Sequence, residues 1–147
     1  MVTLRLATVD DVAEILRRTR DLNAQEGIEI ADSNLEAALR TLLASPELGG
    51  VWLIVREAAP IGYATVTFGY DLEFGGRDAY LTELWIDADQ RGHGAGRDAL
   101  ALLDPELRAL GVKALHLQVR PDNPAIRLYE RTGFVTSPRQ VMTRRLD

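Results

Sequence analysis

Residues 82–103, TELWIDADQRGHGAGRDALALL, and residues 117–134, LQVRPDNPAIRLYERTGF, decide the fold of this chain. In the first stretch an apolar strand leads through a glycine-rich loop into a helix whose leucines recur at helical spacing. In the second stretch the end of a strand leads to a helix that Pro124 can begin and that Gly133 can end. Two strand–loop–helix units in succession are typical of an α/β domain.

The remaining sequence predicts more strands and two earlier helices. Capping-box patterns at Thr8–Asp11 and Ser33–Glu36 indicate helix starts, and these helices run to Gly27 and Pro46. Alternating or β-branched apolar runs predict strands at residues 2–6, 51–57, 61–70, 79–87, 114–120 and 141–146. The order is therefore β-α-α-β-β-β-α-β-α-β. We expect a single domain over residues 1–147 with a mixed sheet.

Composition excludes several classes of protein. The chain has 147 residues, 46% of them hydrophobic, and carries a net charge of −5, which argues against nucleic acid as a partner. It contains no cysteine, so it has no thiolate nucleophile, and His93 and His116 lie too far apart to suggest a metal site. No apolar run of about 18 residues could span a membrane, and the N-terminus lacks the apolar core of a signal peptide. We therefore expect a cytoplasmic protein without a metal or a membrane partner.

The loop Arg91-Gly92-His93-Gly94-Ala95-Gly96 is the strongest local signal. Alternate glycines let the backbone approach a ligand, and the helix that follows offers unpaired N–H groups at its positive end, where Arg91 adds a full charge. The pattern is neither a dinucleotide fingerprint, since Arg97 stands where the third glycine would fall, nor a Walker loop. It predicts an anion site suited to a pyrophosphate, with a flexible connecting loop as the alternative.

Together the two stretches resemble the signature motifs of the GCN5-related N-acetyltransferase (GNAT) family. Arg91, Gly94 and Gly96 fill the family's glycine-loop positions. The second motif, A-I-x-L-Y-x-x-x-G-F, is filled at every specified position by Ala125, Ile126, Leu128, Tyr129, Gly133 and Phe134. The resemblance implies a GNAT-like domain with helices on both faces of the sheet. It also implies that strands 79–87 and 114–120 splay apart at an acetyl-CoA site.

The resemblance further assigns acetyl-CoA contacts to this chain. The pantetheine arm would lie along the strand before the loop, and the pyrophosphate would lie on the loop amides. The residues implied are Leu84, Trp85, Ile86, Arg91, Gly92, His93, Gly94, Ala95 and Gly96. The family often has an asparagine seven residues before the tyrosine, where this chain has Asp122, whereas Asn123 fits when counted from the strand end. Pro105 should kink or split the helix after the loop near Leu103.

Acetyl transfer to an amine needs a proton acceptor and a proton donor. Tyr129 matches the family tyrosine that protonates the departing thiolate, with helix packing as the alternative. Glu83, in the middle of an apolar strand, is the candidate base, with an ion pair to an arginine as the alternative. A water chain could also take the proton. Alternation along the strand would place Leu81, Glu83 and Trp85 on one face.

Acidic residues could line the mouth through which a cationic acceptor enters, with a solvated acidic surface as the alternative. They lie in the predicted hairpin loop and around the first two helices: Asp71, Glu73 and Asp78, and Glu26, Glu29 and Asp32. The sequence thus predicts an acetyl-CoA-dependent N-acetyltransferase that acts by direct attack, on a small-molecule or protein amine. The family also makes a homodimer an open option. A catalytically silent acyl-CoA-binding regulatory module is the alternative from another class, and a nucleotide-binding protein is a third.

Overall fold

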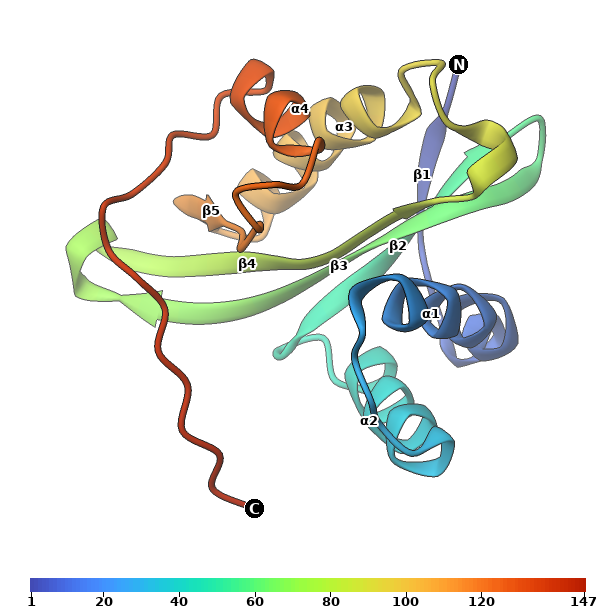
Figure 1. Cartoon of the computed structure of the whole chain (residues 1–147), viewed down its shortest axis with the longest axis horizontal. Coiled ribbons are helices and arrows are strands. Elements are labelled where there is room, and N and C mark those ends of the chain that lie inside the picture. The colour runs from blue at the N-terminus through green and yellow to red at the C-terminus, as the bar shows by residue number, and fades with distance from the viewer.

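The computed structural model describes all 147 residues. Five strands form one sheet in the order β1-β2-β3-β4-β5, in which only the last pair, β4 and β5, is parallel. The predicted α/β fold with a mixed sheet is confirmed (Figure 1). The elements are β1 (Thr3–Leu6), α1 (Val12–Glu26), α2 (Asp32–Ala44), β2 (Gly49–Arg56), β3 (Ala59–Asp71), β4 (Gly76–Ile86), α3 (Ala95–Ala109), β5 (Ala114–His116) and α4 (Ile126–Arg131).

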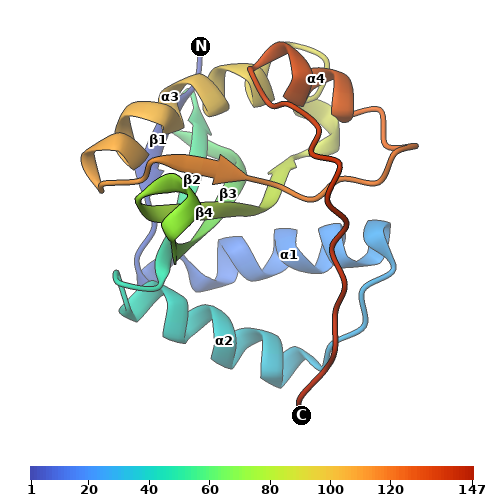
Figure 2. The ribbon, with the colours of Figure 1, turned by 90° about the vertical axis from the view of Figure 1, so that its left-hand side faces the viewer.

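Helices cover both faces of the sheet, as predicted. Helices α1 and α2 lie on one face, and α3 and α4 lie on the other (Figures 1 and 2). Strand alternation supplies each layer with its own apolar residues. Tyr63 and Trp85 are buried in the cluster under α1, whereas Trp52 and Leu103 are buried in the cluster under α3. Neither helix layer contains a helix long and apolar enough to cross a membrane.

A β-bulge interrupts the pairing of β3 with β4. Thr65 faces Glu83, but the next residue, Val66, faces Leu81, so Thr82 has no opposite residue. A bulge shifts the alternation of side chains by one position. Leu81 therefore packs in the cluster under α3, whereas Glu83 shares the α1 face with Trp85. The prediction that all three side chains lie on one face is wrong for Leu81.

Local signals for the helix ends are confirmed in part. The Thr8–Asp11 capping box is present and leads into α1, and Gly27 ends α1 in the left-handed conformation at φ +69°. The second capping box is wrong, because α2 begins at Asp32 and no side chain caps it. Helix α3 is not split at Pro105, since its buried face continues from Leu103 to Leu107 on either side of the proline.

Two predicted strands need correction. Strand β5 stops at His116 instead of Arg120, because only Asp78–Tyr80 of β4 pair with it. Residues 141–146 form no strand; they lie at the surface, with Met142 92% exposed, and no sheet edge pairs with them. The C-terminal segment instead runs past the sheet (Figures 1 and 2). The ends of the other elements differ from the prediction by a few residues.

Candidate active site

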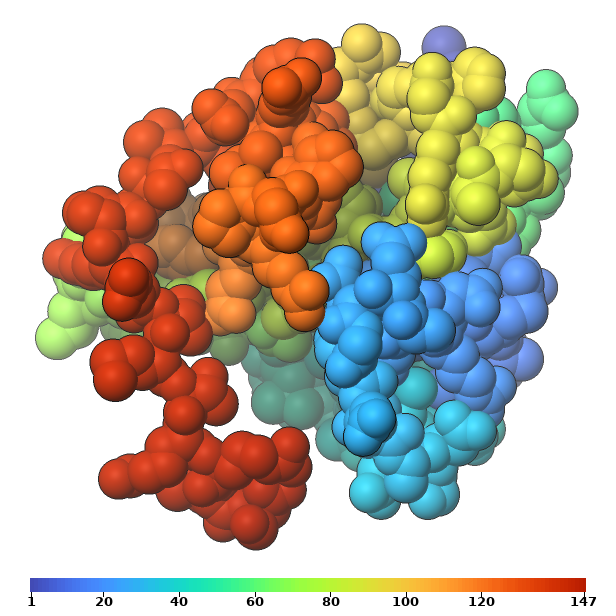
Figure 3. Space-filling view, in the orientation of Figure 1, coloured from blue at the N-terminus to red at the C-terminus, as the bar shows by residue number.

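A cavity of about 1040 Å³ lies where β4 and the segment after β5 part. Its walls come from the C-terminal end of α1, from β4, from the glycine loop with the start of α3, from residues 117–120 and from α4. The surface is hollowed between these segments in Figure 3. The volume is at the upper end of the range of small-molecule and cofactor sites.

The two parallel strands diverge because their pairing ends early. Beyond Tyr80, residues 81–86 of β4 form one wall of the cavity and residues 117–120 form the other. The edge of β4 that faces the gap therefore has no strand partner. Its backbone N–H and C=O groups can pair with an extended ligand, as an added strand would. The predicted strand splay is confirmed.

The glycine loop forms the end of the cavity beside α3. Gly92 and Gly94 have φ of +83° and +80°, which a side chain would strain, and Gly94 is the N-cap of α3. The first N–H groups of this 15-residue helix are available to an anion. Gly96 has a second role, because a Cβ there would lie 3.2 Å from Leu128 of α4. The loop therefore combines a cradle for an anion with close packing of α3 on α4.

The basic residues that line the cavity are only partly those that the sequence predicted. Arg91 lines the cavity, but its Nε donates to the Ile86 carbonyl over 2.7 Å and its guanidinium stacks 4.5 Å from the Trp85 ring. His93 is exposed and lies outside the cavity lining. Arg97 and Arg131 line the cavity and were missed by the sequence analysis. Arg97 directly follows the last loop glycine, and its place in the first turn of the helix was the one sign in the sequence that it lies at the site.

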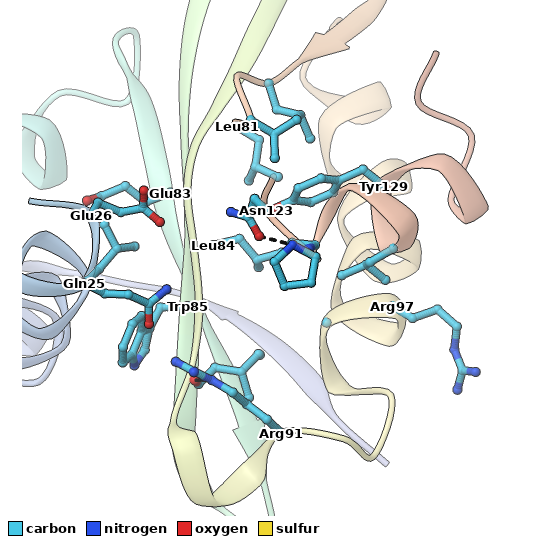
Figure 4. Close-up of a pocket in the computed structure, with 18 of the residues that line it drawn as sticks. Gln25, Glu26, Leu81, Glu83, Leu84, Trp85, Arg91, Arg97, Asn123 and Tyr129 are labelled. Atoms are coloured by element: carbon cyan, nitrogen blue, oxygen red, sulfur yellow. Dashed lines mark hydrogen bonds between the residues drawn. The ribbon is translucent and has the colours of Figure 1, made fainter. Parts of the chain in front are cut away.

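Tyr129 and Asn123 lie on the α4 side of the cavity (Figure 4). Burial raises the pKa of the Tyr129 phenol, and the Glu26 carboxylate raises it further. The ring packs edge-on against Phe134 with 5.8 Å between centroids. The Asn123 side-chain oxygen accepts a hydrogen bond from the Ala125 N–H at 2.9 Å. Asp122, the other candidate for the family asparagine position, does not line the cavity.

Glu83 reaches the cavity from the opposite side of β4, together with Glu26 (Figure 4). It is half-buried, and burial raises the pKa of its carboxyl, which the nearby hydroxyls of Thr65 and Tyr63 counteract. No arginine is among the groups that act on it. The alternative interpretation, a structural ion pair with an arginine, is therefore not what the structure contains.

Of the acidic residues predicted at the acceptor mouth, only Glu26 lines the cavity. Asp71, Glu73 and Asp78 lie at the far end of the sheet, where Glu73 pairs with Arg139 at 2.7 Å and Asp78 with His116 at 3.1 Å. Glu29 and Asp32 follow the end of α1 and do not line the cavity. A broad acidic mouth is therefore not formed, because the hairpin projects away from the gap, and the alternative of an acidic surface away from the cavity holds for the other residues except Asp78, which is buried.

Buried Arg18 fixes α1 against the end of β4. It is 2% exposed, and it donates to both oxygens of Asp87 at 2.9 Å, to Glu14 and to the Pro60 carbonyl. This network holds the helix that carries Glu26. The sequence analysis missed it, because an arginine on an amphipathic helix gives no sign of its partners on strands far along the chain.

The sequence of the chain is similar to those of known acetyltransferases. The model of the acetyltransferase (GNAT) family matches residues 10–134. The N-acetyltransferase YycN of Bacillus subtilis (strain 168), described as uncharacterized, is 37% identical over 59 residues, which cover 40% of this chain and 38% of that protein.

Solved structures agree over almost the whole chain. An integron cassette protein from the mobile metagenome of Cole Harbour Salt Marsh is 28% identical with a TM-score of 0.86, over 98% of this chain and 90% of that one. A predicted acetyltransferase from Clostridium acetobutylicum, solved with acetyl-CoA, has a TM-score of 0.80 over 98% of this chain and 96% of that one. At 20% identity, the second likeness shows the fold alone.

Proposed function

The chain belongs to the acetyltransferase (GNAT) family, and from this premise we propose that it moves the acetyl group of acetyl-CoA to a primary amine by direct attack within a ternary complex. The acceptor is a small-molecule or protein amine, and the protein acts in the cytoplasm. The proposal is supported most directly by the placement of a carboxylate and a phenol at one cavity: Glu83 and Tyr129 approach it from opposite sides of β4.

The residues present fit acetyl-CoA. Gly92 and Gly94 carry no side chains, and beside them the first N–H groups of α3 can bind the pyrophosphate. Arg97 at the start of α3, which also pairs with Asp98 at 3.1 Å, and Arg131 at the end of α4 add positive charge to the cavity lining. Leu84, Trp85 and Ile86 offer the open strand edge to the pantetheine arm, and Asn123 lines the opposite wall. These side chains bind and orient; acetyl-CoA supplies the thioester that carries the acetyl group.

Glu83 has the chemistry of the base. A lysine-like amine has a pKa of about 10.4, so its deprotonation at pH 7 costs about 4–5 kcal/mol at 1.36 kcal/mol per unit. Glu83 takes this proton, directly or through one water, and its raised pKa makes it a better acceptor than an ordinary carboxylate. Glu26 adds negative charge on the same side, which favours a cationic amine at the mouth.

Tyr129 has the chemistry of the acid. Because burial and Glu26 raise its pKa, its phenol stays protonated across the neutral range and can give its proton to the departing thiolate. The cationic amine gives one proton to Glu83 before it attacks, and the nitrogen loses a second proton to solvent as the amide forms. Tyr129 gives its proton to the departing thiolate. Solvent at the cavity mouth restores both groups for the next turnover.

The experiment is a panel of primary amines, from diamines to peptides, incubated with acetyl-CoA while free thiol is measured. The chain contains no cysteine, so every thiol detected comes from the cosubstrate. We expect acceptor-dependent thiol release and an acetylated product that gains 42 Da, the mass of one acetyl group replacing one hydrogen. Tight acetyl-CoA binding with no turnover on any amine would instead favour the silent regulatory module.

A further inference from the structure

The Tyr63 hydroxyl is a buried polar group without a partner. Tyr63 lies in the middle of β3 and is 0% exposed, packed in the cluster under α1. Its oxygen forms no hydrogen bond. Nearly all buried hydroxyls are paired, because an unpaired one destabilises the fold. Phenylalanine would fill the same space without that penalty, so packing alone does not explain a tyrosine here.

The register of the sheet places this hydroxyl beside the candidate base. Tyr63 faces Trp85 and Thr65 faces Glu83, so Tyr63 and Glu83 are diagonal neighbours on one face of the sheet. Diagonal pairs of this kind lie within reach of an aromatic side chain. After burial, the Glu83 carboxylate is the next cause that raises the pKa of Tyr63.

The other polar neighbour on this face, Thr19, is the weaker acceptor. The Thr19 hydroxyl of α1 lies near Tyr63, but it donates to the Ile15 carbonyl at 2.9 Å. An ionised carboxylate is a stronger acceptor than a neutral hydroxyl. The Glu83 carboxylate is therefore the stronger of the two acceptors next to the Tyr63 hydroxyl.

We propose that Tyr63 is a positioning residue for Glu83: its hydroxyl donates to the ionised carboxylate from the buried side and holds the second carboxylate oxygen toward the cavity. The catalytic consequence rests on the proposed function, in which Glu83 is the base. The hydrogen bond itself does not, and it can be measured without any acceptor.

Other charged groups surround the pair and are left in place when the hydroxyl is removed. Arg18 of α1 acts on Tyr63 and is held by Glu14 and Asp87. Glu26 of α1 and Tyr129 of α4 face the cavity beside Glu83. Tyr63→Phe keeps the ring and all of these charges, so it isolates one donor.

The first measurement is a carboxyl ¹³C titration of Glu83 by NMR, with the signal identified by its loss in Glu83→Gln. Removing a donor from a charged acceptor should raise the titration midpoint of Glu83 by about one pH unit in Tyr63→Phe. Tyr70→Phe, on the same strand but 76% exposed, is the matched control and should leave the midpoint unchanged. An unchanged midpoint in Tyr63→Phe overturns the proposal.

The second measurement uses any acceptor that the amine panel identifies. The acidic limb of kcat/KM should move up by the same pH interval in Tyr63→Phe, so activity below the limb falls about tenfold and recovers at higher pH. In the Glu83→Gln background, Tyr63→Phe should have no further effect. A loss of equal size at every pH indicates a structural role and overturns the proposal. If Glu83→Gln alone leaves activity intact, the base assignment fails while the NMR result still decides the hydrogen bond.

Discussion

Replacing Glu83 by glutamine should expose the energetic cost of deprotonating the acceptor. The substitution keeps the shape of the side chain and removes only its ability to take a proton. At pH 7 the cost for a lysine-like amine is about 4–5 kcal/mol, which sets the largest contribution a base can make. We expect kcat/KM to fall by roughly 10–10³-fold, or about 1.4–4 kcal/mol.

The same arithmetic fixes the pH dependence of the defect. At pH 9.5 only about 1 kcal/mol of the deprotonation cost remains, because about a tenth of the amine is already neutral in solution. The ratio of wild-type to Glu83→Gln activity should therefore shrink toward less than tenfold. The assay is thiol release from acetyl-CoA between pH 6.5 and 9.5, under conditions where the chemical step limits the rate. A constant ratio across this range would refute the role of Glu83 as the base.

Stability provides an independent check on the same variant. The folded-state pKa of Glu83 is raised by burial, so the folded protein binds this proton more tightly than the unfolded chain. The ionised carboxylate therefore costs stability at neutral pH, and this cost fades as the pH falls through the folded-state pKa and is gone below the pKa of the unfolded chain. Glu83→Gln should melt at the same or a higher temperature at pH 7. A lower melting temperature with a pH-independent activity loss would indicate a structural glutamate.

The remaining variants test the acid, the loop and the anchoring of α1. Tyr129→Phe keeps the packing on Phe134 and should lower kcat about 10²-fold with little change in acetyl-CoA affinity; wild-type kcat would reduce Tyr129 to a packing residue. Gly94→Val should weaken acetyl-CoA binding at least tenfold by calorimetry, whereas Gly111→Val, with φ +82° at the other end of α3, carries the same backbone strain and should bind normally. Arg18→Met removes the cation that pairs with Asp87, whose carboxylate then keeps only the Trp85 indole N–H at 3.1 Å, and should cost about 3 kcal/mol in chemical denaturation, against less than about 1 kcal/mol for Arg17→Met at an exposed pair.

The glycine loop and helices α1 and α3 could be predicted because their signals are local. A run of glycines before an amphipathic helix, or Gly27 after one, restricts the backbone within a few residues. The segment 141–146, predicted as a strand, carries apolar residues at both ends but finds no partner, and pairing is a property of the whole sheet. The early end of β5 has the same cause, since β4 pairs with it only as far as Tyr80.

At the candidate site too, residues with local sequence signals could be predicted, whereas residues that depend on tertiary contacts could not. Glu83 and Tyr129 could be singled out by residue type and spacing, and both line the cavity. Arg131 and the anchoring of Arg18 depend on elements that meet only in the folded chain. The acidic hairpin residues show the converse, because their composition suggested a binding surface while the length of the hairpin carries them to the far end of the sheet.

The bulge at Thr82 explains how one strand serves two layers at the site. A regular strand would place Leu81 and Glu83 on the same face, which would bury the carboxylate with the leucine or expose the leucine with the carboxylate. The shift sends Leu81 into the core under α3 and leaves Glu83 on the α1 side. The Thr82 hydroxyl donates to the Thr65 carbonyl at 3.2 Å, which supplies a hydrogen bond at the point where the ladder is interrupted. A polar residue at the bulge therefore lets an apolar strand present a carboxylate beside its own core.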